Sequence, residues 1–206
     1  MNIKSKQIID EIELFTGKFI EDITSNDLNN IQELTINGFD VAKNHLEFHL
    51  EDLLLFNNLK KITFNNFILD IDTMNYIYNS KIEELNMYNC ELLCKITNNY
   101  ENINVLRVEY TTNFIEDYLS YFPNVKELAF KGYELSKDLS KKISKLDLMN
   151  TKVSNNNIIE KSNVNDLYIS KDEYDNHKDF YEKLIIRVNV YDENNCYLIG
   201  KGDKNE

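Results

Sequence analysis

The sequence contains no tryptophan, one proline and only five glycines in 206 residues. This composition leaves little room for flexible or proline-rich linkers, so we expect one continuous domain. No apolar run approaches the roughly 18 residues that a membrane-spanning helix needs. The first residues, MNIKSKQIIDEIELF, lack the long apolar segment of a secretory signal. The sequence therefore predicts a cytoplasmic protein that does not contact a membrane.

Cysteine and basic side chains are also scarce. The chain has three cysteines, Cys90, Cys94 and Cys196, and an odd number does not indicate a disulfide framework. The spacing Cys90-x3-Cys94 is not that of a zinc knuckle, so we expect no metal site there. Lys and Arg number 23 against 35 Asp and Glu, which gives a net charge of −12. Phosphates repel such a chain, so we expect no direct nucleic-acid binding. The acidity suits a partner protein with a basic surface, or serves only to keep the chain soluble.

The motifs of common catalytic sites are missing as well. The sequence contains no G-x-x-x-x-G-K-[ST], G-x-G-x-x-G or G-x-S-x-G pattern. HLEFH places His45 and His49 four residues apart on an expected helix, but it lacks the glutamate that follows the first histidine in H-E-x-x-H. The acidic pairs Asp70/Asp72 and Glu116/Asp117 are interpreted as helix caps. We therefore expect no catalytic residues, no metal and no cofactor, and predict that the protein is not an enzyme.

A repeated apolar frame is the main positive feature. VKELAFKGYEL, from Val125, is apolar at relative positions 1, 4, 6 and 11, a spacing that fits neither the helical period nor the simple strand period. Copies of this frame begin at Ile31, Leu59, Ile82, Ile103, Val125, Ile143, Val164 and Tyr181. They follow one another at intervals of about 20 residues, which is typical of a solenoid whose units bury their apolar faces against each other.

The frame resembles the leucine-rich repeat, L-x-x-L-x-L-x-x-N/C-x-L, from about Ile31 to Tyr191. At position 9, where the family places Asn or Cys, it matches only at Cys90 and Asn189. An Asn or Gly one place earlier supplies the tight-turn chemistry in several copies, namely Gly38, Asn66, Asn89, Gly132 and Asn150. Cys90 at a turn position is interpreted as a buried structural thiol.

The resemblance implies an α/β fold, a leucine-rich-repeat solenoid with a curved parallel sheet of about eight strands and short helices or turns on the convex side. We expect a single domain over 1–206, with an N-terminal helical cap over 1–30, repeats over 31–191, and a closing strand and tail over 192–206. Helices are predicted over 4–16, 41–56 and 113–122, the last ended by Pro123. Residues 184–191 and 196–200 are predicted to form a closing hairpin.

Positions 3, 5 and 7 of each copy are expected to point outward, because side chains alternate along a strand. Position 3 alternates in charge from copy to copy over most of its length: Glu33, Lys61, Glu84, Val105, Glu127, Lys145, Asp166 and Lys183. Ion pairs between neighbouring strands of this kind predict a structural role for this column and penalise wrong stacking.

The remaining outward positions carry Tyr, Arg and Met in the middle and late copies, which are residue types enriched at interface hot spots. The candidate partner-binding residues are Tyr88, Arg107, Glu109, Tyr110, Met149 and Tyr168. The alternative is that these are ordinary sheet-surface residues with good β-propensity.

The resemblance implies a non-enzymatic module that holds a partner protein on the exposed face of the sheet. The alternative is a small acidic inhibitor, similar in role to anti-CRISPR or toxin-immunity proteins, that blocks a basic, nucleic-acid-handling enzyme. An enzyme is a third hypothesis, which a pocket of converging titratable groups would favour. A structural or assembly role is a fourth, which light scattering that shows only monomer would weaken.

Overall fold

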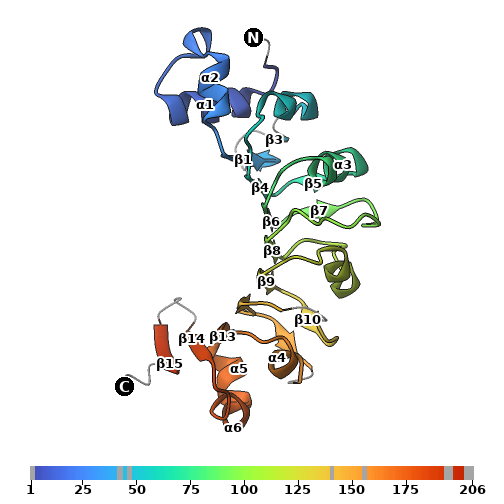
Figure 1. Cartoon of the computed structure of the whole chain (residues 1–206), viewed down its shortest axis with the longest axis vertical. Helices are drawn as coiled ribbons and strands as arrows, with labels where there is room; N and C mark the ends of the chain where they lie inside the picture. The colour runs from blue at the N-terminus through green and yellow to red at the C-terminus, as the bar shows by residue number, and fades with distance from the viewer. Residues whose placement is uncertain are drawn as a thin grey trace. The chain divides into compact units, whose positions relative to one another are not determined.

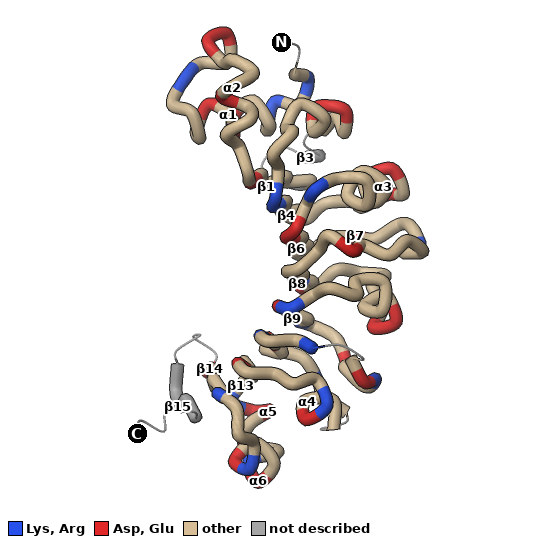
Figure 2. The backbone as a smooth tube through the Cα atoms, in the orientation of Figure 1, with Lys and Arg blue, Asp and Glu red and all other residues tan. Residues whose placement is uncertain are grey.

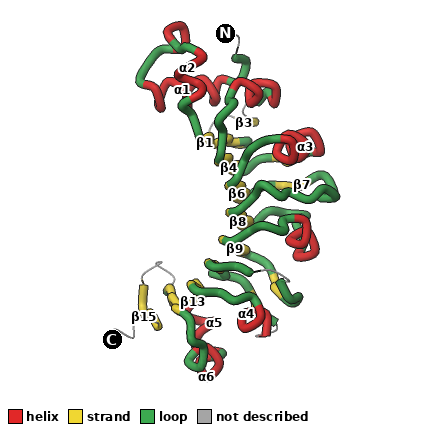
Figure 3. Tube along the Cα trace, in the orientation of Figure 1, coloured by secondary structure: helices red, strands yellow, loops and turns green. Residues whose placement is uncertain are grey.

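The computed structural model describes residues 3–40, 44–45, 48–139, 142–154, 157–192 and 197–201. The chain is α/β, with short parallel strands followed by helices and loops (Figures 1 and 3). It divides into two compact units. The first comprises Met1–Ile103 and Thr111–Phe114, and the second Asn104–Tyr110 and Ile115–Glu206. The expectation of one continuous domain stays a prediction.

The first unit begins with the predicted helical segment. It consists of α1 (Lys6–Thr16), the 3₁₀ helix η1 (Ile20–Asp22) and α2 (Ser25–Asn29). α1 buries Ile8 and Ile12 and ends at Gly17 in the left-handed region, with φ of 66°. The helical spacing of Ile8, Ile9, Ile12 and Leu14 in the sequence predicts one apolar stripe, but this prediction is wrong for Leu14, which is 82% exposed. The helix therefore covers the unit with a narrower face than the sequence indicates.

Three parallel strands in the first unit follow the repeated frame. They are β1 (Glu33–Asn37), β4 (Lys61–Asn65) and β6 (Glu84–Tyr88), with Leu34, Ile62 and Leu85 in register. Smaller pairs are β2 (Phe39–Asp40) with β3 (Asn44–His45), antiparallel, and β5 (Ile68–Leu69) with β7 (Glu91–Leu92), parallel. The helices are η2 (Leu50–Leu55) and α3 (Ile71–Asn79). Asp70 caps α3 as predicted, because its carboxylate accepts a hydrogen bond from the Thr73 amide at 2.8 Å.

The predicted helix over 41–56 is wrong. The segment contains strand β3 and then the 3₁₀ helix η2, and residues 41–43 and 46–47 lie outside the described residues. Asp52, inside η2, accepts hydrogen bonds from the backbone amides of Lys4 and Ser5 at 3.0 and 2.7 Å. Contacts with a distant part of the chain thus accompany a tight helix that is shorter than local periodicity predicts. His45 and His49 therefore do not share a helix face.

The second unit repeats the arrangement. Its parallel strands are β8 (Val105–Glu109), β9 (Glu127–Lys131), β11 (Lys145–Asp147), β13 (Asp166–Ser170) and β14 (Arg187–Tyr191). β15 (Tyr197–Lys201) pairs antiparallel to β14, as the closing hairpin predicts, and β10 (Glu134–Leu135) pairs with β12 (Lys152–Val153). The helices are η3 (Glu116–Tyr121), α4 (Asn157–Lys161), α5 (Lys171–Asn176) and α6 (Lys178–Tyr181). η3 is 3₁₀ where an α-helix was expected, and it ends before Pro123 as predicted.

The core of each unit is built from the fourth and sixth positions of the frame. These side chains are buried: Leu34, Ile36, Ile62, Phe64, Leu85 and Met87 in the first unit, and Leu106, Val108, Leu128, Phe130, Leu146, Leu148, Leu167 and Ile169 in the second. Each such side chain contributes about 1.5–3 kcal/mol on burial. The prediction for these positions is confirmed, and it fixes which side chains of each strand point outward.

The predicted frame of the last copy is wrong. It places Leu184 at the buried anchor, but β14 begins at Arg187, and Val188 and Val190 are the buried residues. Ile185 is 102% exposed. The reason is that Tyr181, the first position of this copy, ends helix α6, and a turn over residues 182–186 delays the start of the strand. Arg187, not Lys183, is thus the residue opposite Asp166.

Candidate protein-binding face

The outward side chains of the parallel strands in the second unit form the surface that we call the outer face. Its members are Val105, Arg107, Glu109, Glu127, Ala129, Lys131, Lys145, Asp147, Asp166, Tyr168, Ser170, Arg187, Asn189 and Tyr191. Most are partly exposed and alternate with buried core residues along β8 and β13. The alternation follows from the two-residue pleat of a strand.

Left-handed turns follow most of the parallel strands in the two units. Asn66, Asn89 and Asn150 adopt φ of 49°, 51° and 57°, and Gly132 adopts 85°. The Gly132 amide donates to the Asn150 carbonyl at 3.2 Å, and in the first unit the Asn66 amide donates to the Tyr88 carbonyl at 2.9 Å. Asn and Gly tolerate this conformation best, so the predicted tight-turn role of the eighth position is confirmed at these residues.

Tyr110 occupies the same turn position after β8, with φ of 51°. The other non-glycine residues with positive φ in the described part of the chain are all asparagines. The left-handed conformation costs a residue of this type about 1–2 kcal/mol. Tyr110 is 48% exposed, and its hydroxyl accepts a hydrogen bond from Asn150 Nδ2 at 3.0 Å. A large aromatic ring is thus held at the end of the outer face against the local backbone preference.

Lys131 is the centre of one charge cluster on the outer face. Its Nζ lies 3.1 Å from Glu109 Oε1 and 3.0 Å from Asp147 Oδ2, and only 14% of its side chain is exposed. Burial by itself would lower the pKa of Lys131, but the carboxylates of Asp147 and Glu109 outweigh it and raise this pKa above its usual value. The ammonium therefore holds three neighbouring strands together.

A second cluster combines charges with tyrosine rings. Arg107 Nη2 lies 3.8 Å and Lys145 Nζ 4.0 Å from Glu127 Oε2. Lys145 Nζ also lies 5.3 Å from the centre of the Tyr168 ring, within cation–π range. Tyr168 stacks on Tyr191 with ring centres 6.1 Å apart. The two stacked tyrosines thus lie beside a balanced set of charges.

The predicted column of alternating charges is present where the strands are in register. In the first unit Lys61 Nζ lies 3.3 Å from Glu33 and 3.7 Å from Glu84. In the second unit the predicted pair is that of Lys145 with Glu127, at 4.0 Å. The residue predicted to lie opposite Asp166 was Lys183, but Arg187 takes that place, and its Nη1 lies 3.2 Å from Asp166 Oδ1. Pairs this exposed contribute about 0–1 kcal/mol each. Their role is to favour the observed register over shifted ones.

The structure groups five of the six predicted binding residues in the second unit. Arg107 and Glu109 lie on β8, Tyr168 lies on β13, and Tyr110 follows β8. Met149 is not on a strand: it lies in the turn after β11, half-buried, and its amide donates to Asp147 Oδ1 at 3.1 Å. Tyr88 ends β6 in the first unit and is therefore not part of the outer face.

Sequence reasoning did not select three residues that shape the outer face. Lys131 and Lys145 were at outward positions of the frame, but only the structure shows Lys131 between two carboxylates and Lys145 over a tyrosine ring. Tyr191 was missed because the frame of the last copy was wrong. The signal that could have found it is the alternation of apolar and polar residue types in RVNVY, from Arg187 to Tyr191.

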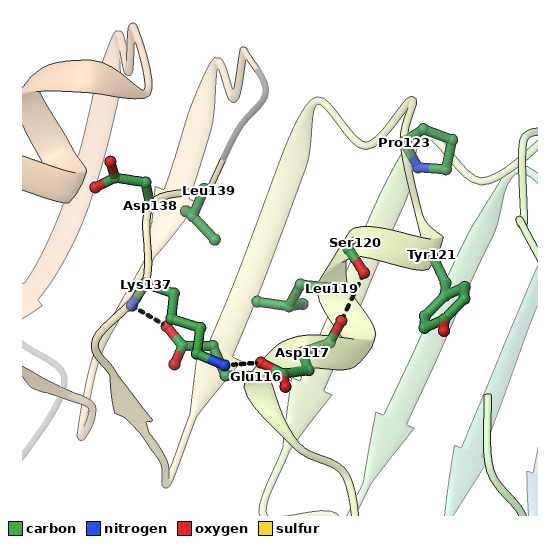
Figure 4. Close-up of a pocket in the computed structure, with 9 residues that line it drawn as sticks. All are labelled: Glu116, Asp117, Leu119, Ser120, Tyr121, Pro123, Lys137, Asp138 and Leu139. Carbon is green, nitrogen blue, oxygen red and sulfur yellow. Dashed lines mark hydrogen bonds and ion pairs between the residues drawn. The ribbon is translucent and has the colours of Figure 1, made fainter. Parts of the chain in front are cut away.

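A cavity of about 550 Å³ lies behind the sheet of the second unit, beside η3. Figure 4 shows it between η3 and the segment that contains Lys137 and Leu139. Glu116 does not cap its own helix here: its carboxylate accepts hydrogen bonds from the amides of Ser136 and Lys137 at 2.7 and 2.5 Å. Lys137 in turn pairs with Asp117. These bonds join η3 to the segment of Ser136 and Lys137. The acidic pair Glu116/Asp117 therefore has a structural role.

Cys90 lies in the core, as its turn position predicts. Its thiol lies 3.3 Å from the carbonyl oxygen of Phe64, to which it donates. Burial raises the pKa of Cys90 to about 11, so the thiolate is almost absent at neutral pH. Within the described ranges no three His, Cys, Asp or Glu side chains come together in a way that could hold a metal ion.

The described helices are all too short and too polar to cross a bilayer. In sequence comparisons the chain matches no protein-family model and no curated protein.

Proposed function

We propose that the chain is a leucine-rich-repeat solenoid that acts as a non-catalytic protein-binding module. Its parallel strands, most of them followed by a left-handed turn and a short return segment, support the repeat assignment. In this proposal the outer face holds the partner protein. Arg107, Tyr110 and Tyr168 are the principal contacts, with Tyr191 beside them.

The backbone of Tyr110 is the observation that carries this proposal. Tyrosine replaces the Asn or Gly of the other turns at a cost of about 1–2 kcal/mol and presents a half-exposed ring. Strained residues of this kind are retained where function needs them. Tyrosine is also among the residues that contribute most to interface energy.

The charge balance of the outer face indicates the kind of partner. Glu109, Glu127, Asp147 and Asp166 are matched there by Arg107, Lys131, Lys145 and Arg187. The acidic excess lies elsewhere, and Figure 2 shows acidic residues along the helices and loops that follow the strands. The partner surface at the outer face is thus expected to be apolar and hydrogen-bonding, not strongly basic.

The test is affinity capture from an extract of the native cell by wild-type protein and by Tyr110→Asn and Tyr168→Ala. Tyr110→Asn restores the residue type of the other turns, so it removes the ring without straining the fold. Tyr78→Ala is the control, because Tyr78 is 44% exposed on α3 and outside the outer face. A protein retained by wild type and Tyr78→Ala but lost from both outer-face variants supports the proposal; equal retention by all four contradicts it.

The acidic inhibitor of a basic, nucleic-acid-handling enzyme is the second candidate, and the net charge of −12 favours it. Such an inhibitor would bind through acidic segments outside the outer face. Its capture of the enzyme would weaken strongly between low and high salt, because exposed charges are screened. Capture of this enzyme would also be unaffected by Tyr110→Asn. The response to this one substitution therefore separates the two candidates.

A further inference from the structure

A second recessed surface lies in the first unit, between α1 and the strands β1 and β4. Its volume is about 310 Å³, and we call it the α1 pocket. Its walls include Glu11, Leu14 and Phe15 from α1, and Glu33, Thr35 and Lys61 from the strands. Because it belongs to the first unit, it is separate from the outer face and does not rest on the proposed function.

The helix side of the α1 pocket is apolar and open to solvent. Leu14 is 82% exposed and Phe15 is 56% exposed. α1 turns Ile8 and Ile12 into the core, so its last turn leaves these two side chains at the pocket wall. Adjacent exposed apolar side chains beside a recess are typical of a surface that a partner covers.

One acidic side chain of the α1 pocket, Glu11, has no counter-ion among the described residues. Among the described residues no Lys, Arg or His lies within ion-pair distance of the half-buried Glu11 carboxylate. Lys61, the one cation among the described wall residues, already pairs with Glu33 and Glu84. Burial raises the pKa of Glu11, and the negative charges of Asp10 and Glu33 add to this. A cation entering the pocket would oppose both effects by favouring the ionised form of Glu11.

We propose that the α1 pocket receives an arginine side chain, next to an apolar residue, from a partner protein. The guanidinium would bond to Glu11, with the Thr35 hydroxyl as a further acceptor, while the aliphatic stem lies along Leu14 and Phe15. Arginine fits better than lysine because its guanidinium is planar, weakly hydrated and stacks on aromatic rings such as Phe15.

The test uses the dipeptide acetyl-Leu-Arg-amide as the probe and backbone amide NMR signals as the readout. Its neutral analogue, acetyl-Leu-citrulline-amide, keeps the shape of the side chain and removes its charge. The signals of Glu11, Phe15 and Thr35 are expected to shift with a dissociation constant on the order of 1 mM. The citrulline analogue and Glu11→Gln are each expected to weaken binding by about fivefold.

Two variants keep this test decisive. Glu21→Gln removes the same charge from an exposed residue of η1 outside the pocket and is expected to leave binding unchanged. Leu14→Ser removes an exposed side chain, so it should fold normally and still weaken binding. The proposal is overturned if the signals do not move by about 10 mM probe, if citrulline binds as well as arginine, or if Glu21→Gln weakens binding as much as Glu11→Gln. It is equally overturned if the same signals broaden with protein concentration alone, which would mean that a second copy covers the pocket.

Discussion

The ring of Tyr110 lies directly against Gly132. A Cβ built on Gly132 would come within 2.4 Å of Tyr110 Cδ1 and 2.7 Å of Cε1. Gly132 also adopts φ of 85°, a conformation that side chains disfavour. Glycine is therefore needed here for two separate reasons, the backbone conformation and the space that the tyrosine ring occupies.

Gly132→Ala is expected to destabilise the protein more than Gly17→Ala. Gly17 adopts φ of 66°, but no described atom lies within 4 Å of the position that a Cβ would take, so its substitution carries only the conformational cost of about 1–2 kcal/mol. Gly132→Ala carries this cost and must also displace the ring. Urea unfolding of both variants measures the difference, and adding Tyr110→Ala to Gly132→Ala should abolish it. Equal destabilisation by the two glycine substitutions would show that the ring yields freely.

The buried half of each strand could be predicted from the sequence because apolar spacing records it directly. Leu106 and Val108, for example, are both buried in β8 as the frame requires. The frame fails after a helix: it places Leu184 in a strand, but α6 ends only at Tyr181, and a turn separates it from β14, which begins at Arg187. The helix expected over 41–56 fails for a related reason, because apolar spacing alone does not separate a helix from a strand followed by a 3₁₀ turn.

The candidate site was harder to predict because it depends on pairing between strands. Arg107 and Tyr168 could be named as outward residues from their positions in the frame. That Lys131 joins Glu109 and Asp147 depends on which strands are neighbours and on the reach of the lysine side chain. The conformation of Tyr110 is set by its turn, and only comparison with the asparagines of the other turns shows that it is unusual.

Lys131→Met is expected to destabilise the protein at neutral pH by about 1–3 kcal/mol. The substitution keeps the length of the side chain but leaves the carboxylates of Glu109 and Asp147 without their shared cation. Lys61→Met is the control, because Lys61 also bridges two carboxylates but is more exposed, and its loss should cost at most about 1 kcal/mol. Chemical unfolding followed by circular dichroism compares the two. A smaller loss for Lys131→Met than for Lys61→Met would contradict the assigned role.

The stabilisation by Lys131 is also expected to disappear at high pH. Its folded-state pKa is raised above the unfolded value, so its contribution is fully present below about pH 10. As the pH rises through the raised pKa, the ammonium loses its charge, and the free energies of unfolding of wild type and Lys131→Met should converge. A difference that stays constant to about pH 12 would contradict a stabilisation that depends on the charge of Lys131.

Asp27 is expected to give the opposite pH dependence. Hydrogen bonds from the side chains of Lys18 and Thr24 and from the Thr24 amide lower its pKa to about 2. Because the unfolded value is about 3.9, its contribution is present above about pH 4 and is lost as the pH falls through 2. Asp27→Asn should therefore lower the melting temperature at pH 6 but have little effect near pH 2. Glu21→Gln, which removes a charge from the same helical segment and none of its described hydrogen bonds, is the control. An equal pH profile for both variants would contradict the role of the Asp27 bonds.

Cys90 is expected to resist thiol reagents in the folded protein. Its side chain is buried, it donates to the Phe64 carbonyl, and burial raises its pKa to about 11, so both access and thiolate are lacking. Cys94 is only half-buried and should react at least about tenfold faster at pH 8. The measurement is the rate of maleimide labelling, located by peptide mass spectrometry, in a chain with Cys196→Ser. In urea the two rates should become equal, since the fold alone protects Cys90. Equal rates in the native protein would mean that the core around β4 and β6 opens faster than the reagent reacts, contrary to the tight packing of Phe64 and Cys90.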